Sequence, residues 1–196
     1  MGEKSKQLVY DEILNETTEK KSTTAPELDT DPNLTCCISG HRPKYLPWGY
    51  EEKGRVYHRV RRELKQALEL SINDGYCYFI TGMAMGIDII GAEVILELQQ
   101  NYPQVKLIAA IPCLGQTKSW TADYKARYQK ILDACYKQII VSPVEYSRWC
   151  MHKRNRFMVN HSTRLIAVHS PDSDGGTFHT INYAQQKGLD VIVIKT

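Results

Sequence analysis

The chain lacks any run of apolar residues long enough to cross a membrane as a helix, which takes about 18 or more in succession. Its opening segment, MGEKSKQLVYDEILNE, lacks the apolar stretch and the small-residue cleavage site of a secretory signal peptide. None of its six cysteines forms a CxxC pair, and most lie in apolar segments, where cysteine behaves as a small hydrophobic residue. We therefore expect a cytoplasmic protein with reduced thiols and no membrane partner.

Motifs for metal binding and for the common nucleotide folds are missing as well. The six histidines show neither HxxxH nor HExxH spacing, and the cysteines do not complement them, so we expect no metal site. The P-loop pattern GxxxxGK[ST] is absent, and so is GxGxxG, because Gly82 and Gly86 are four residues apart. These absences disfavour a P-loop ATPase and a standard dinucleotide fold.

The composition is that of an ordinary globular protein. Of the 196 residues, 42% are hydrophobic and 24% are charged. A chain of this size buries roughly 70% of its unfolded surface, so it needs neither disulfides nor metal for stability. The formal net charge of +3 suits an anionic ligand but is far from that of a protein that coats nucleic acid.

The sequence divides into a polar beginning and a patterned remainder. Residues 1–33 are rich in Glu, Lys, Thr, Asp and Pro, which predicts a flexible N-terminal arm. In residues 34–196, short β-type runs alternate with segments of helical periodicity. This alternation predicts an α/β protein, a three-layer Rossmann-like fold with a mainly parallel central sheet flanked by helices. The expected strands are about 35–39, 77–81, 106–111, 137–141, 164–169 and 191–194, and the expected helices include about 52–72, 147–160 and 178–187.

Glycine-containing loops follow most of the expected strands. The five loops read SGHRP, TGMAMGID, PCLG, SPVEY and HSPDSDGGT, and four contain glycine. Ligands bind at the carboxyl ends of parallel strands, where glycine lets backbone approach a phosphate. The alternatives are that each glycine makes a tight turn and that Asp88 caps its helix. The expected ligand-binding residues are Gly40, His41, Arg42, Gly82, Met83, Gly86, Asp88, Arg154, Asn155, Gly175, Gly176 and Thr177.

The segment CMHKRNRFMVNHS has a positively charged residue on its packed face. Met151 and Met158 mark that face, and Arg154 and Asn155 fall on it. A buried arginine requires an anion, which is either a carboxylate, with Asp88 and Glu145 as candidates, or a phosphate of a ligand. Arg156 points elsewhere, toward solvent or the rim of a pocket.

These motifs resemble the SLOG superfamily of Rossmann-like proteins, and within it most closely the bacterial YpsA-like family, whose function is poorly defined. The resemblance covers about residues 34–196 and lies in CCISGHRPKYLPWGY, TGMAMGIDIIGAE, RNRFMVNHSTRLIAVHS and DGGTFHTINYAQQKG. It implies a Rossmann-like fold.

Two further families of the superfamily are similar at the same segments. MHKRNRFM and GGT resemble elements of the cytokinin-activating phosphoribohydrolases, which makes Arg154 a candidate catalytic residue, but His179 stands where those enzymes have a catalytic glutamate. GMAMGID and RNR are similar to elements of DprA, a family that binds single-stranded DNA. The sequence shows no interleaving of aromatic and basic residues that would stack successive bases.

Three functions follow from these observations. The first, favoured over an enzyme, is a sensor or regulatory module that binds a nucleotide-type phosphate ligand such as NAD or ADP-ribose, requires no cofactor and is able to form a homodimer. The second is a nucleotide N-glycosidic hydrolase that uses Arg154 with Asp88 or Glu93 as its carboxylate. The third is single-stranded DNA binding.

Overall fold

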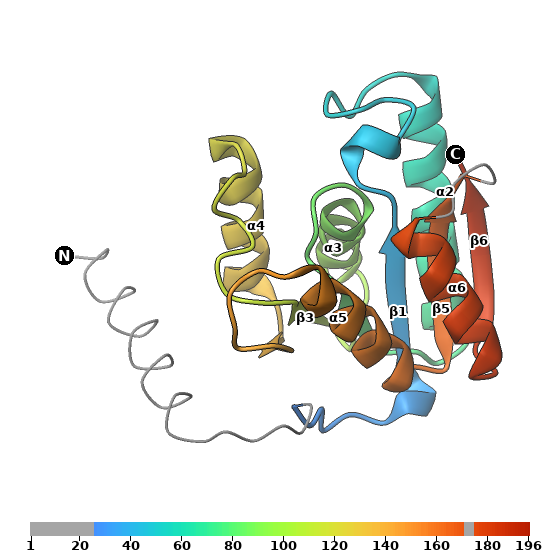
Figure 1. Ribbon diagram of the computed structural model, residues 1–196. Helices are drawn as coiled ribbons and strands as arrows, with labels where there is room; N and C mark the ends of the chain where they lie inside the picture. Colours follow the sequence, from blue (N-terminus) through green and yellow to red (C-terminus); the bar gives the residue numbers. More distant parts are fainter. Residues whose placement is uncertain (1–25, 171–174) are drawn as a thin grey trace.

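Six parallel strands form one sheet in the computed structural model, which describes residues 26–170 and 175–196 (Figure 1). The spatial order is β4-β3-β2-β1-β5-β6. This arrangement confirms the predicted Rossmann-like α/β class. The strands are β1 Thr35–Gly40, β2 Tyr78–Thr81, β3 Lys106–Ile111, β4 Lys137–Ile140, β5 Arg164–His169 and β6 Asp190–Lys195.

Helices cover both faces of the sheet (Figure 1). One face carries α2 (Arg55–Asn73), α3 (Ile87–Leu98) and α4 (Ala122–Ala134), which pack side by side. The other face carries α5 (Arg148–Asn160) and α6 (Gly176–Gln186), which contact each other. Two short 3-10 helices, η1 Pro32–Leu34 and η2 Pro43–Tyr45, lie before and after β1. No described helix has the combined length and apolarity that crossing a membrane would take.

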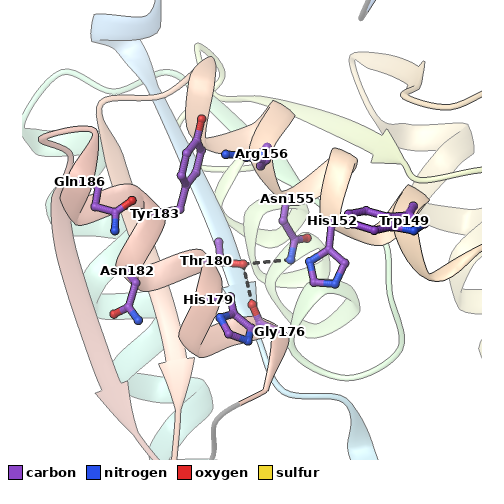
Figure 2. Close-up of a pocket in the computed structure, with 10 residues that line it drawn as sticks. All are labelled: Trp149, His152, Asn155, Arg156, Gly176, His179, Thr180, Asn182, Tyr183 and Gln186. Atoms are coloured by element: carbon purple, nitrogen blue, oxygen red, sulfur yellow. Dashed lines mark hydrogen bonds between the residues drawn. The ribbon is translucent and has the colours of Figure 1, made fainter.

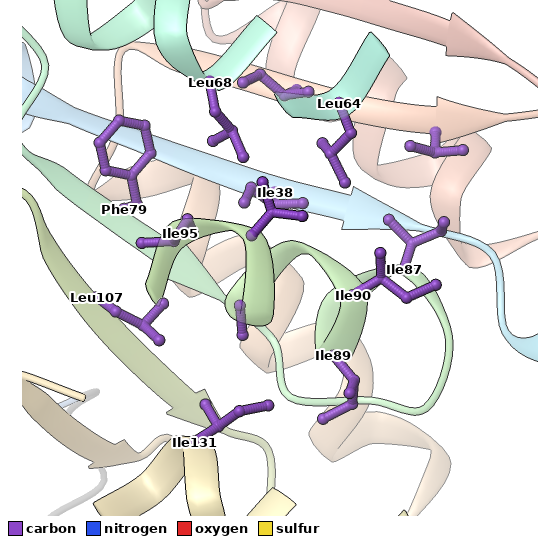
Figure 3. Packing of buried hydrophobic residues seen from close by; sticks show 14 of the residues in the cluster. Ile38, Leu64, Leu68, Phe79, Ile87, Ile89, Ile90, Ile95, Leu107 and Ile131 are labelled. Carbon is purple, nitrogen blue, oxygen red and sulfur yellow. The ribbon is translucent and has the colours of Figure 1, made fainter. Parts of the chain in front are cut away.

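The four inner strands β1, β2, β3 and β5 are mostly apolar because the sheet is buried on both faces there. In β1, Cys36 and Ile38 belong to the cluster beneath α2 and α3, whereas Cys37 belongs to the cluster beneath α5 and α6. Figure 3 shows the first cluster, in which Leu64 and Leu68 of α2 pack over the sheet. Side chains alternate between the faces of a strand, so one short run contributes to two cores.

The predicted elements agree with the observed ones except at some ends. The expected strands 106–111 and 164–169 have the observed bounds. The helix expected from 52 begins at Arg55, because Gly54 adopts φ 92° as its N-cap. The flexible arm predicted for residues 1–33 lies largely outside the described residues, and Leu28 in the described part is buried.

The order of the sheet reverses between β1 and β5. The chain leaves β1 for α2 on one face and leaves β5 for α6 on the opposite face. The two outgoing segments therefore separate at the carboxyl edge, which is the place where doubly wound sheets hold ligands. The strand order thus places the candidate ligand site at the loops that follow β1 and β5.

Candidate functional site

A cavity of about 500 Å³ opens at the carboxyl ends of β1 and β5. We name it the switch-point cavity. Residues from the loops after β1, β2 and β4, from α5 and from the start of α6 line it: Ser39, Gly40, His41, Arg42, Lys44, Tyr45, Ala84, Asp88, Tyr146, Met151, His152, Arg154, Asn155, Gly175, Gly176, Thr177 and His179. A second cavity of about 380 Å³ adjoins it through Arg42, Ala84, Tyr146 and Met151 and includes Gly115 of the loop after β3.

The cavity brings together nine of the twelve residues expected to bind a ligand. These nine are Gly40, His41, Arg42, Asp88, Arg154, Asn155, Gly175, Gly176 and Thr177. The other three, Gly82, Met83 and Gly86, do not line it. Met83 is fully buried, so its side chain belongs to the core. Residues 171–174 of the predicted loop HSPDSDGGT lie outside the described part of the chain.

Gly82 and Gly86 are needed for close packing. A Cβ at Gly82 would overlap the guanidinium of Arg154, and a Cβ at Gly86 would collide with the carbonyl oxygen of His41. Gly86 also has φ 93°, in the left-handed region that favours glycine. The two glycines therefore leave room for Arg154 and for the loop after β1. From the sequence, we expected instead that their backbone would approach a phosphate.

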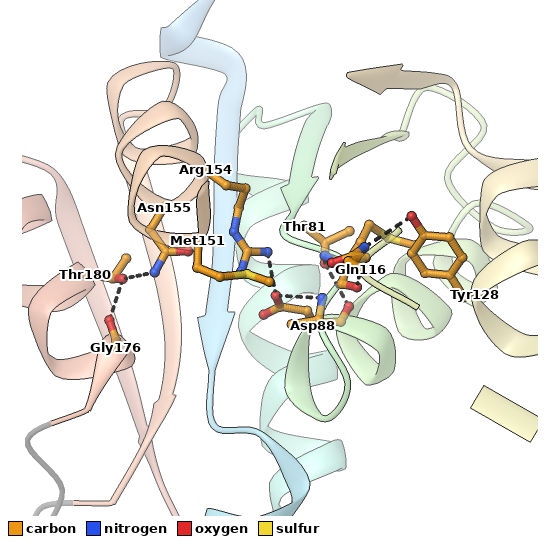
Figure 4. Close-up of polar contacts among 11 residues, drawn as sticks. Thr81, Asp88, Gln116, Tyr128, Met151, Arg154, Asn155, Gly176 and Thr180 are labelled. Atoms are coloured by element: carbon orange, nitrogen blue, oxygen red, sulfur yellow. Dashed lines mark hydrogen bonds and ion pairs between the residues drawn. The ribbon is translucent and has the colours of Figure 1, made fainter. Parts of the chain in front are cut away.

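Arg154 forms a buried ion pair with Asp88, one of the two carboxylates proposed for it (Figure 4). Arg154 Nη1 donates to Asp88 Oδ2 at 2.9 Å, and the backbone N–H of Ala84 donates to the same oxygen at 3.2 Å. Burial raises the pKa of Asp88, against the positive charges of Arg154 and Arg42. Burial likewise lowers the pKa of Arg154, against the charge of Asp88. The pair joins α5 to α3 beneath the cavity.

His41 bridges the loops that follow β1 and β5. Its Nε2 accepts a hydrogen bond from the backbone N–H of Ser170 at 2.9 Å, so this nitrogen carries no proton. The imidazole rings of His41 and His169 lie with centroids 5.2 Å apart. Burial lowers the pKa of His41, and the neighbouring His169 adds to this shift. His41 is therefore a neutral link across the point where the sheet order reverses.

Asn155 fixes α6 against α5 at the edge of the cavity. Its Nδ2 donates to Thr180 Oγ1 at 2.9 Å, and Thr180 Oγ1 donates to the carbonyl oxygen of Gly176 at 2.8 Å (Figure 4). The described first turn of α6 contains no acidic residue, and no side chain of the described residues caps it. Backbone N–H groups at such a helix end are suited to bind an anion.

The remaining acidic candidates are occupied elsewhere. Glu93, considered as a catalytic carboxylate, accepts hydrogen bonds from Arg127 at 2.7 and 2.8 Å and does not line the cavity. Glu145, the other proposed partner of Arg154, pairs with Lys118 at 3.2 Å. Asp88 is the single carboxylate among the described residues of the lining. No three histidine, cysteine or acidic side chains in residues 26–170 and 175–196 form a cluster able to hold a metal ion.

The structure adds site residues that the sequence did not predict. Lys44, Tyr45, Tyr146 and His152 line the cavity, and Trp149 lies nearby at the start of α5 with 75% of its surface exposed. Lys44 and Tyr45 continue the loop GHRPKYLPWGY, so their proximity to Arg42 was the available signal. Tyr146 and His152 come from a different part of the chain and meet the cavity only through the fold, and Trp149 lies outside the cavity lining.

Sequence comparison identifies relatives over most of the chain. The model of the YpsA family, described as the YspA SLOG family, matches residues 36–194. The uncharacterized SPbeta prophage-derived protein YoqJ of Bacillus subtilis (strain 168) is 33% identical over 132 residues, which cover 62% of this chain and 77% of that protein. A UPF0398 protein of Bacillus thuringiensis (strain Al Hakam) is 27% identical over 135 residues, which cover 66% of this chain and 71% of that protein.

Two solved structures of DNA processing protein A share the fold. The Helicobacter pylori protein, studied for its single-stranded DNA binding mode, aligns with a TM-score of 0.55 and 17% identity, over 83% of this chain and 65% of that chain. The Streptococcus pneumoniae protein aligns with a TM-score of 0.52 and 19% identity, over 81% of this chain and 50% of that chain. Because the family match extends over residues 36–194, the chain belongs to the YpsA family of SLOG proteins.

Proposed function

We propose that this protein binds a nucleotide-type ligand with a phosphate in the switch-point cavity. The observation that carries the proposal is the position of this cavity at the reversal of strand order, where it gathers Arg42 and the start of α6, which no described side chain caps. Backbone N–H groups at a helix start and an arginine side chain are both suited to phosphate oxygens. The volume of about 500 Å³ lies in the range of small-ligand sites, which is about 300–1,000 Å³.

The charge of the lining supports an anionic ligand. Arg42, Lys44 and Arg154 are cationic, and Asp88 is the single described anion, so two positive charges remain. Since Arg154 is already paired with Asp88, we assign direct contact with phosphate to Arg42, which is exposed. Arg154 then acts as a positioning residue that holds α5 and the loop before α3 at the cavity.

The same arrangement supports binding without turnover. Cleavage of an N-glycosidic bond requires a carboxylate near the sugar to stabilise its cationic transition state. Asp88 is held by Arg154 and by the N–H of Ala84, and Glu93 is held by Arg127. A regulatory module that responds to its ligand is consistent with these contacts.

Thermal unfolding in the presence of inorganic phosphate, AMP, ADP, NAD and ADP-ribose tests the proposal. A ligand that binds the folded state raises the midpoint in a concentration-dependent way. We expect stabilisation by at least one nucleotide, its loss in Arg42→Ala, and its retention in Arg62→Ala, which removes an exposed arginine of α2 outside the cavity. Stabilisation unaffected by Arg42→Ala would contradict the proposal, and release of free base would replace binding by hydrolysis.

Single-stranded DNA binding is a second candidate, favoured by the exposed aromatic residues around the site. Tyr45, Tyr146 and Trp149 are all exposed, and bases stack on such side chains. The fold similarity to DNA processing protein A is consistent with this function. Fluorescence anisotropy of a labelled oligothymidylate at several salt concentrations tests it, because phosphate contacts make affinity fall steeply with salt. Affinity that does not respond to salt would exclude this candidate.

A further inference from the structure

A groove between α5 and α6 extends from the switch-point cavity. It has a volume of about 810 Å³, and Figure 2 shows the side chains of both helices that line it. On α5 these are Trp149, His152, Asn155 and Arg156, which share one face of the helix. Its floor is the hydrogen-bonded link from Asn155 to Thr180. We call this feature the α5–α6 groove.

The groove and the cavity are continuous. His152, Asn155, Gly176 and His179 line both of them. The start of α6, where we place the phosphate, therefore lies between the two spaces. A mononucleotide held in the cavity would leave the larger groove unfilled.

Aromatic and amide groups give the groove the chemistry of a nucleobase site. Trp149 presents a largely exposed indole, a surface on which any base can stack. Asn182 and Gln186 on α6 supply amide groups that donate and accept hydrogen bonds, as base edges require.

The charge of the groove suits a polyanion. The Arg156 guanidinium lies 4.7 Å from the ring centroid of Tyr183 and, among the described residues, forms no ion pair with a carboxylate. The described lining holds no acidic residue. A peptide with acidic groups would find few amide or carbonyl partners on the main chain here, because both walls are helices whose backbone groups are bonded internally.

We propose that the α5–α6 groove is a second subsite, which takes the second nucleoside of a ligand in which two nucleosides are joined through phosphate. Trp149 stacks on its base, and the positive charge of Arg156 in the groove favours the anionic ligand. This inference rests on the proposed function, because the first nucleotide is held in the switch-point cavity. The two-nucleoside chemistry occurs both in a small dinucleotide such as NAD and in consecutive residues of a single strand.

Calorimetric titration of the full chain with matched ligands tests the second subsite. The ligands are AMP against NAD, and thymidine monophosphate against 5′-phosphorylated dithymidylate, so each pair compares one nucleoside with two. We expect one of the two larger ligands to bind about tenfold more tightly than its mononucleotide, since stacking of a base on an aromatic side chain contributes on the order of this much. Which pair shows the gain identifies the source as a free dinucleotide or a strand.

Trp149→Ala should remove that gain and leave mononucleotide affinity within about twofold, because Trp149 does not line the switch-point cavity and its exposed indole contributes little to folding. The matched control is Tyr136→Ala, whose aromatic ring is 55% exposed at the start of β4, the opposite edge of the sheet. It should change none of the affinities.

Several outcomes would overturn the second subsite. If mononucleotides bind and require Arg42, but neither larger ligand gains affinity or the gain survives Trp149→Ala, the subsite fails while the proposed function stands. If no nucleotide binds, both fail. If Trp149→Ala converts a dimer to a monomer in sedimentation velocity without changing the gain, the indole is a contact between copies of the chain.

Discussion

Asp88 and Arg154 form a buried ion pair in which each charge requires the other. Each has about 5% of its surface exposed, so neither could stay ionised in the fold without the other. We expect Arg154→Met to lower the free energy of unfolding by about 3–5 kcal/mol, because it leaves Asp88 buried without a cation. In urea denaturation, the double variant Asp88→Asn with Arg154→Met should lose less free energy of unfolding than the two single variants lose when their losses are added. Strict additivity would show that the pair is not coupled.

Gly82 has a specific steric requirement. Gly82→Ala places a methyl group within the space of the Arg154 guanidinium, and we expect a loss of about 2–3 kcal/mol in the free energy of unfolding. Gly176→Ala is the matched control, because a Cβ there meets no atom within 4 Å. Its stability should change by about 1 kcal/mol at most. Equal losses in the two variants, measured by urea denaturation, would argue against the proposed overlap.

His41 should make stability depend on pH. Its folded-state pKa lies below the ordinary value of 6.5, so the unfolded state binds more protons as the pH falls through that value. The stabilisation is therefore complete above pH 6.5 and is lost as the pH falls toward the folded-state pKa. Urea denaturation at about pH 7.5 and about pH 5.5 measures this loss. Between these two pH values, the free energy of unfolding should fall less in His41→Gln than in the unchanged chain. An identical loss in both would refute this role.

At the scale of residues, the sequence was informative where a physical requirement was local. The position of Arg154 on a packed face predicted an anionic partner, and Asp88 was one of two named. The role of Gly82 was not predictable, because the guanidinium that fills the space beside it comes from α5. The periodicity of a segment does not identify which distant side chain packs against it.

The secondary structure was largely predictable because each element carries its own pattern. Strands buried on both faces are short apolar runs, and β3 and β5 have the predicted bounds. The ends of helices were less predictable. The start of α6 lies at Gly176, two residues before the predicted position, with Gly175 as its N-cap and a hydrogen bond from Asn155 of α5 to Thr180 in its first turns.

Two side-chain hydrogen bonds join α5 to α6, and the part-buried one runs from Asn155 to Thr180. Thr180→Val keeps the shape of the side chain but removes the acceptor for Asn155 and the donor to Gly176. We expect a loss of about 1–3 kcal/mol in the free energy of unfolding, since Asn155 is left without this partner. Tyr183→Phe, which removes a hydrogen bond to Asn160 between the same helices, should cost less because that bond is exposed. A larger loss in Tyr183→Phe would contradict this ranking.

For the whole molecule, the strand order decides which loops meet. The predicted alternation of strands and helices implied a parallel sheet, but the reversal between β1 and β5 became known only from the structure. Three aromatic side chains show how the fold brings distant segments together. Tyr45 is far from Tyr146 and Trp149 in the sequence, yet the fold arranges the three of them around the cavity and the groove.

In the proposed function, a nucleotide phosphate binds at the start of α6 beside Arg42. A ¹H–¹⁵N titration with the nucleotide that stabilises the protein tests it most directly. We expect the amide signals of Gly176 and Thr177 to shift on saturation, while those of Gly75 and Gly188, at the opposite edge of the sheet, do not. Arg42→Ala should abolish the shifts at the same nucleotide concentration. Shifts confined to the opposite edge, or none at saturation, would contradict the claim.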